Sequence, residues 1–256
     1  MSFNQTPAPI AQAPVASTGS MISNKPVDAF INLGNGPYPQ ASLITTGGAQ
    51  PWYNSPGVAT IFGGPPTLQQ QQSFDAAILR DVQRTFSQSG IPITLTTDPT
   101  QAALHTLSVV SNTVSSSLPS AIGMTQVGTN GFSFIDQSAQ SAQTVNQLEQ
   151  IVAHNVSHEL MLAFGVPENY DQTGQYVDAR MASWSMMVSP TATFSPAASL
   201  AISQAIQSQE NAAGGLGAQL LNPTANAVPE PATWISWIAV ASTALGFARA
   251  RRKAGK

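Results

Sequence analysis

The chain contains no cysteine and very little charge. Without cysteine it can form no disulfide, no thiolate metal site and no cysteine nucleophile. Charged residues make up 8% of the sequence, against about 25% in an average soluble domain, so the surface must consist mainly of Ser, Thr, Gln, Asn, Gly and Pro. With 256 residues, 42% of them hydrophobic, the chain can still bury a substantial core.

Basic residues are especially scarce outside the C-terminal end. Five of the nine Lys and Arg residues fall in the last eight positions. Without residues 229–256, four basic residues face eleven acidic ones, a net charge of −7. This balance argues against nucleic-acid binding, because a basic face is needed to replace the counterions of the phosphates.

The N-terminal end lacks a sustained apolar run. Residues 1–26 are rich in Pro, Ala, Ser and Gln, which predicts a disordered lead-in. The basic n-region and apolar h-region of a secretory signal are not visible in them.

Short apolar runs between turn residues predict the strands of an α+β domain over residues 27–210. These strands are expected at residues 27–33, 91–96, 105–110 and 132–136. Residues 34–66, rich in Gly and Pro, are expected to form irregular loop, and residues 211–228 a linker. The apolar run at 105–110 contains His105, which we expect to be a hydrogen-bonded core histidine.

Three helices are expected in the same domain. Apolar residues four apart predict the first, over residues 68–88. A long helix is expected over residues 141–164, closed by Gly165 and a nearby proline. The last opens at Ser195, with serine as the N-cap and proline at the first turn.

Two of the three histidines lie four residues apart on the long helix, and Glu159 follows the second. Because residues i and i+4 share a helix face, the imidazoles of an HExxH motif bind one zinc ion, and its Glu reaches a zinc-bound water. After His154, Asn155 stands in place of that Glu. After His158 the Glu is present, but Leu162 replaces the second histidine. The pair is therefore either a zinc site or a pair of metal-free, hydrogen-bonded histidines.

The last 28 residues form a separate segment. An uncharged, mostly apolar stretch, residues 232–248, stands between Pro229-Glu230-Pro231 and a basic cluster that contains Arg249, Arg251 and Arg252. Its 17 residues are near the lower limit for a membrane-spanning helix, and the basic cluster should stay cytoplasmic. We therefore expect a single C-terminal membrane-spanning helix, with the body of the protein outside the cytoplasm.

In the order and spacing of these parts, the tail resembles a PEP-CTERM sorting signal. The resemblance implies export in a bacterium of Gram-negative type and transient anchoring in the inner membrane. It also implies recognition by an exosortase-type membrane enzyme, cleavage near Pro-Glu-Pro, and release to the cell surface or extracellular matrix. An ordinary tail anchor is the alternative.

The order of elements over residues 27–210 is similar to that of a matrixin-like metzincin domain. That resemblance implies a small mixed sheet, a site helix, a Met-turn formed by Met186 or Met187, and a C-terminal helix. Gly165 would be the glycine that turns the chain toward the third metal ligand.

The same resemblance implies a ligand set for zinc. Counted from His158, the third ligand of the family falls on Glu168. The candidate ligands are therefore His158, Glu168 and, one turn outside the family frame, His154, with Glu159 as the general base. Leu162 cannot bind a metal.

The sequence thus predicts an exported, envelope-targeted bacterial surface or matrix protein with a metzincin-like, catalytically impaired domain. One alternative is an active, atypical zinc endopeptidase, in which Glu159 deprotonates a zinc-bound water that attacks a peptide substrate. Another is an adhesive or matrix protein without any metal site, which the low-charge composition favours.

Overall fold

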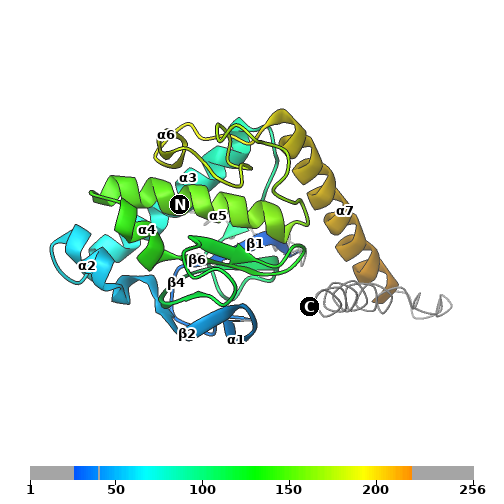
Figure 1. Cartoon of the computed structure of the whole chain (residues 1–256). Helices are drawn as coiled ribbons and strands as arrows, with labels where there is room; N and C mark the ends of the chain where they lie inside the picture. The colour runs from blue at the N-terminus through cyan, green and yellow to red at the C-terminus, as the bar shows by residue number, and fades with distance from the viewer. Residues whose placement is uncertain (1–25, 40, 221–256) are drawn as a thin grey trace, which may run out of the picture. The chain divides into compact units, whose positions relative to one another are not determined.

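A mixed β-sheet with flanking helices forms the core of the protein (Figure 1). The computed structural model describes residues 26–39 and 41–220. The predicted α+β class is therefore confirmed for this part of the chain. The lead-in up to residue 25 and the sorting segment 229–256 lie outside the described residues.

The sheet has six strands in the order β3-β1-β4-β6-β5, with β2 also paired to β4. The pairs β1–β3, β1–β4 and β4–β6 are parallel, whereas β5 runs antiparallel to β6 and β2 antiparallel to β4. The strands are β1 (Val27–Asn32), β2 (Thr45–Pro51), β3 (Leu95–Thr96), β4 (Ala103–Ser115), β5 (Gly123–Thr125) and β6 (Gly131–Phe134). One edge of the sheet is therefore the antiparallel strand β5.

Strand β4 is longer than the apolar run that predicted it, because it pairs with three other strands. Its first half pairs with β1, its middle with β6 and its polar end, from Val110 to Ser115, with β2. The prediction of irregular loop over residues 34–66 was accordingly wrong. That region contains β2, whose partner is distant in sequence, and the short helices α1 (Ala41–Ile44), η1 (Trp52–Asn54) and α2 (Pro56–Phe62).

Helix α3 (Leu68–Gln88) has the bounds that the apolar spacing predicts. A capping box starts it: the Thr67 hydroxyl accepts from the Gln70 N–H, and the Gln70 side chain accepts from the Thr67 N–H. Its apolar stripe is buried and includes Phe74, Ile78, Val82 and Phe86. This stripe packs α3 against the site helix.

The long helix predicted over residues 141–164 is α5 (Val145–Ala163), and a short helix that the sequence did not predict, α4 (Ile135–Ser141), precedes it. Ala142 has extended backbone angles, and Thr144 caps α5 by accepting from the Gln147 N–H. Residues 135–136, predicted as the end of a strand, begin α4 instead. Helix α5 lies over the sheet, between the strands and the segment that carries α6 (Trp184–Met187) (Figure 1).

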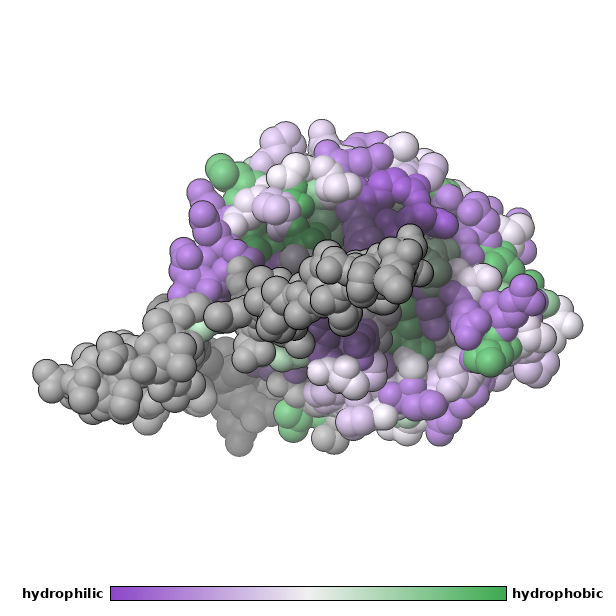
Figure 2. All heavy atoms as spheres, turned by 180° about the vertical axis from the view of Figure 1, so that it is seen from behind, coloured by the Kyte–Doolittle hydropathy of each residue, from purple (hydrophilic) through white to green (hydrophobic). Residues whose placement is uncertain are grey.

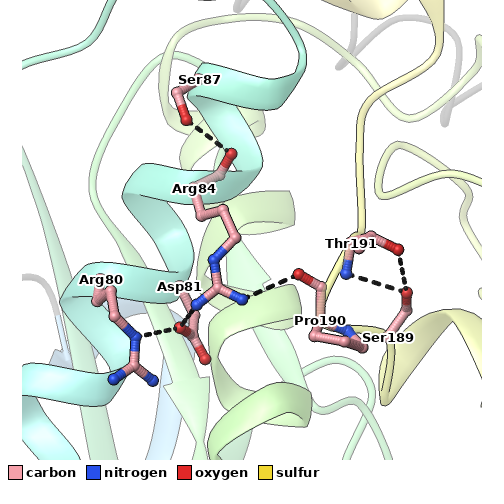
Figure 3. A network of polar contacts seen from close by, with 7 residues as sticks. All are labelled: Arg80, Asp81, Arg84, Ser87, Ser189, Pro190 and Thr191. Carbon is pink, nitrogen blue, oxygen red and sulfur yellow. Dashed lines mark hydrogen bonds and ion pairs between the residues drawn. The ribbon is translucent and has the colours of Figure 1, made fainter.

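Polar contacts hold the segment between α6 and the final helix. Arg84 of α3 forms an ion pair with Asp81 and donates to the Pro190 carbonyl at 3.0 Å (Figure 3). Arg80 also pairs with Asp81, through its Nε at 2.8 Å. These contacts tie α3 to the chain that precedes the final helix.

The final helix, α7 (Pro196–Leu220), begins where predicted, with the Ser195 hydroxyl accepting from the Ala198 N–H. It continues into the predicted linker as far as Leu220, and no proline interrupts residues 211–220. Within residues 26–39 and 41–220, none of the helices is both long and apolar enough to cross a membrane. On the face opposite to that of Figure 1, hydrophilic side chains surround smaller hydrophobic patches (Figure 2).

Candidate metal centre

The second half of α5 is buried on every side. Each residue from Ile151 to Ala163 is buried, because the sheet, α3 and the segment with α6 all pack on this helix. Its polar side chains are therefore away from water, and each needs a partner inside the protein.

Asn155 and Glu159 lie on the side of α5 that faces the edge strand β5. The Asn155 amide donates to the Ile122 carbonyl at 3.0 Å and to the Ser133 hydroxyl at 2.9 Å. Gly123 leaves the space for both side chains, since a Cβ at that position would lie 2.6 Å from Asn155 Nδ2 and would collide with Glu159 Oε1. Asn155 thus fastens α5 to β5 and β6.

The two ring nitrogens of His158 have different partners. Nδ1 lies 2.7 Å from the Val177 carbonyl, so it must carry a proton and donate. Nε2 lies 3.4 Å from Glu168 Oε2, and Arg180 Nε lies 3.7 Å from the other Glu168 oxygen. Nε2 is therefore the only ring atom of His158 that could bind a metal.

The electrostatics around His158 favour its charged form. Burial alone would lower the pKa of His158, but the contact with Glu168, the Glu159 charge and the Val177 carbonyl together raise it. The contact with His158 lowers the pKa of Glu168, with a smaller contribution from Arg180. A proton on Nε2 completes an ion pair with Glu168 and competes with any metal for that nitrogen.

Glu159 is buried without a full set of partners. Burial raises its pKa to about 7, although His158 and Thr125 oppose the shift. Its Oε2 finds no hydrogen-bond partner in the described part of the chain. Near neutral pH this carboxyl group can therefore both accept and release a proton.

His154 lies one helical turn before His158 and does not share the contact that His158 makes with Glu168. Burial, with a contribution from His158, lowers the pKa of His154 to about 3, so its ring is neutral at physiological pH. Its Nδ1 is buried and lacks a hydrogen-bond partner among the described residues. It is a neutral histidine inside the core.

These residues do not fit a zinc site with three protein ligands. Two ligands of a tetrahedral zinc lie roughly 3.4 Å apart, so His158 and Glu168 have the spacing of such a pair. The next candidate position carries Leu162, whose side chain belongs to the hydrophobic core. Over residues 26–39 and 41–220, no three His, Asp or Glu side chains come together in a group that could hold a metal ion.

The chain beyond α5 places Glu168 and the candidate Met-turn. Gly165 (φ 89°) and Val166 end α5 with paired bonds to the Leu162 and Met161 carbonyls, as in a Schellman motif. Asp171 and Asp178 then hold the following loop through bonds to Thr173 and Ser195. In α6, Met186 and Met187 are partly buried and pack against the core.

Sequence reasoning missed several partners of the site, among them Ser133, Val177 and Arg180. The first two act through groups that any sequence offers, a hydroxyl and a backbone carbonyl, so no pattern marks them. Arg180 could have been noticed, because few basic residues lie in the body of the chain.

The sorting-motif residues, Pro229, Glu230, Pro231, Arg249, Arg251 and Arg252, lie outside the described residues. Comparison with protein-family models, curated proteins and solved structures found no match to this chain.

Proposed function

We propose that residues 27–210 form a metzincin-like domain that has lost its zinc site and serves as a surface or matrix component. In support, the chain has a first strand, helix α3, an edge pair β5–β6, helix α5, a methionine-containing turn and a final helix in that order. The tail motif supports export, membrane anchoring through residues 232–248 and an exosortase-type processing partner.

The observation that carries the proposal is the ion pair between His158 and Glu168. The two candidate ligands contact each other directly, because His158 Nε2 faces the Glu168 carboxylate. One turn later, where the zinc motif has its second histidine, the chain carries the buried Leu162. Because Val177 and Glu168 both belong to the chain after α5, His158 now joins that segment to the helix through both ring nitrogens. The site thus acts as a structural clamp.

An active zinc endopeptidase is the second candidate. It is favoured by Glu159, since a buried carboxyl group with a pKa of about 7 suits a general base at neutral pH. The same candidate requires a third metal-binding side chain, which the described residues do not provide.

Zinc content tests the proposal. We expect the purified full-length protein, dialysed against micromolar zinc, to retain much less than one zinc per chain by elemental analysis. Leu162→His should bind about one zinc, because it adds an imidazole at i+4 from His158, near Glu168. Adding His158→Ala to that variant should abolish the binding.

Asn146→His is the matched control, because it places a new histidine at the exposed start of the same helix, with no histidine three or four residues away and far from Glu168. It should bind no more zinc than the natural protein. Stoichiometric zinc in the natural protein, lost in His158→Ala, would contradict the degenerate site and favour the peptidase.

A further inference from the structure

His105, on strand β4, has an oxygen atom opposite each ring nitrogen. Nδ1 lies 3.2 Å from the Thr129 carbonyl, in the turn between β5 and β6. Nε2 lies 3.0 Å from Gln209 Oε1, on helix α7. The ring is buried and packs edge-to-face against Phe164, with 5.4 Å between ring centroids. His105 therefore joins three elements that are far apart in sequence.

The Gln209 amide has a defined orientation. Its Nε2 donates to the Phe164 carbonyl at 3.3 Å, which directs its oxygen toward His105. If the amide turned over, its oxygen would face the Phe164 carbonyl, and two acceptors would meet there. The acceptor in contact with the imidazole is thus set by a second hydrogen bond.

A neutral imidazole cannot satisfy both partners. It has one N–H donor and one bare nitrogen, whereas Thr129 and Gln209 both present acceptors. Either bare nitrogen would face an oxygen lone pair inside the core. Only the doubly protonated ring donates to both.

We propose that His105 is a proton-dependent latch that holds helix α7 on strand β4. The protonated ring bonds to the β5–β6 turn and to α7 together. Loss of the proton breaks one of these bonds, and the bond to Gln209 is the one that joins α7 to β4. The proposal is independent of the zinc question.

Few other titratable side chains lie on the elements around His105. Strand β1, its neighbour in the sheet, carries Asp28, whose Oδ2 accepts from the Thr94 N–H and hydroxyl. Helix α7 carries Glu210, next to Gln209. The turn with Thr129 and the last turn of α5 carry no charged residue.

The direction of the effect follows from this arrangement. A histidine side chain ordinarily changes charge between about pH 5 and 8. Acid therefore favours the ring form that makes both hydrogen bonds, and base favours the form that makes one. Helix α7, which leads from the domain toward the tail, should be held more firmly in acid.

Amide hydrogen exchange on the full-length protein in a mild detergent tests the latch. Protection factors, corrected for intrinsic rates, would be compared at pH 5.5 and pH 8 for peptides from α7. We expect the α7 amides near Gln209 to open about 2- to 10-fold more often at pH 8, as one net hydrogen bond predicts. Gln209→Met, which keeps the length of the side chain but not the acceptor, should remove this pH dependence.

Gln207→Met is the matched control, because Gln207 is exposed on the same helix. It should keep the pH dependence of the natural protein. NMR of the His105 ring nitrogens gives a second readout and should show both protonated at pH 5.5. A neutral ring at pH 5.5, or equal pH dependence in Gln209→Met and the natural protein, would overturn the proposal.

Discussion

At the scale of single residues, a carboxyl group buried without a full set of hydrogen bonds opposes folding whenever it is ionised, and Glu159 is such a group. Burial raises its pKa from 4.5 to about 7 in the folded protein. The unfolded chain therefore ionises first, and stability is lost as the pH rises from about 4.5 to about 7. At pH 8 the folded state carries the whole penalty.

Glu159→Gln should remove this penalty. We expect the variant to be more stable than the natural protein at pH 8, by up to about 3 kcal/mol, and to differ little at pH 4.5. Urea denaturation at the two pH values measures the difference. Glu149→Gln, a less buried site on the same helix, should give a smaller gain. Parallel pH profiles for Glu159→Gln and the natural protein would contradict the assignment.

Single residues also show how far the sequence could predict the site. The ten-residue spacing from His158 led to Glu168, and the structure places the two side chains 3.4 Å apart. The spacing could not reveal the second ring partner, since Val177 acts through its carbonyl. No sequence pattern indicates that the two bonds of His105 reach residues 24 and 104 positions away.

At the scale of elements, the packing of α5 on the edge strand depends on one glycine. A Cβ at Gly123 would collide with the Glu159 carboxyl group and crowd the Asn155 amide. We expect Gly123→Ala to destabilise the protein by about 1–3 kcal/mol, because α5 and β5 must move apart. Thermal or urea denaturation would measure this.

Gly48→Ala is the matched control, since a Cβ there meets nothing within 4 Å. It should change stability little. Combining Gly123→Ala with Glu159→Ala should recover part of the loss, because the shortened side chain leaves room for the new methyl group. Purely additive effects in this double-mutant cycle would contradict the proposed contact.

The elements that the sequence predicted well are those set by local signals. Helix α3 has both a capping box at Thr67 and a regular apolar stripe, and its predicted bounds agree with the structure. The region 34–66 failed because its only strand, β2, is stabilised by β4, some 60 residues later. The long helix was predicted to start at residue 141 and not at Val145, because Thr144, which caps α5, lies in a polar stretch without Gly or Pro. Local patterns cannot show which distant segment completes a strand.

At the scale of the whole molecule, charge is separated along the chain. The residues before position 229 carry a net charge of −7, whereas five basic residues occupy the last eight positions. Between them lies the uncharged stretch 232–248. This distribution suits a protein whose acidic body stays on one side of a membrane while the basic end stays on the cytoplasmic side.

Deletion of residues 228–256 should therefore release the body from the membrane. We expect the truncated protein in the soluble fraction after cell lysis and high-speed centrifugation, and the full-length protein in the membrane fraction, because only the deletion removes the apolar stretch. Replacing Pro229, Glu230 and Pro231 by alanine is the matched control. It keeps the apolar stretch, so this variant should stay in the membrane fraction, and in a host with an exosortase-type enzyme it should remain unprocessed. Membrane association unchanged by the deletion would rule out the tail as the anchor, and normal processing of the alanine variant would rule out the sorting motif.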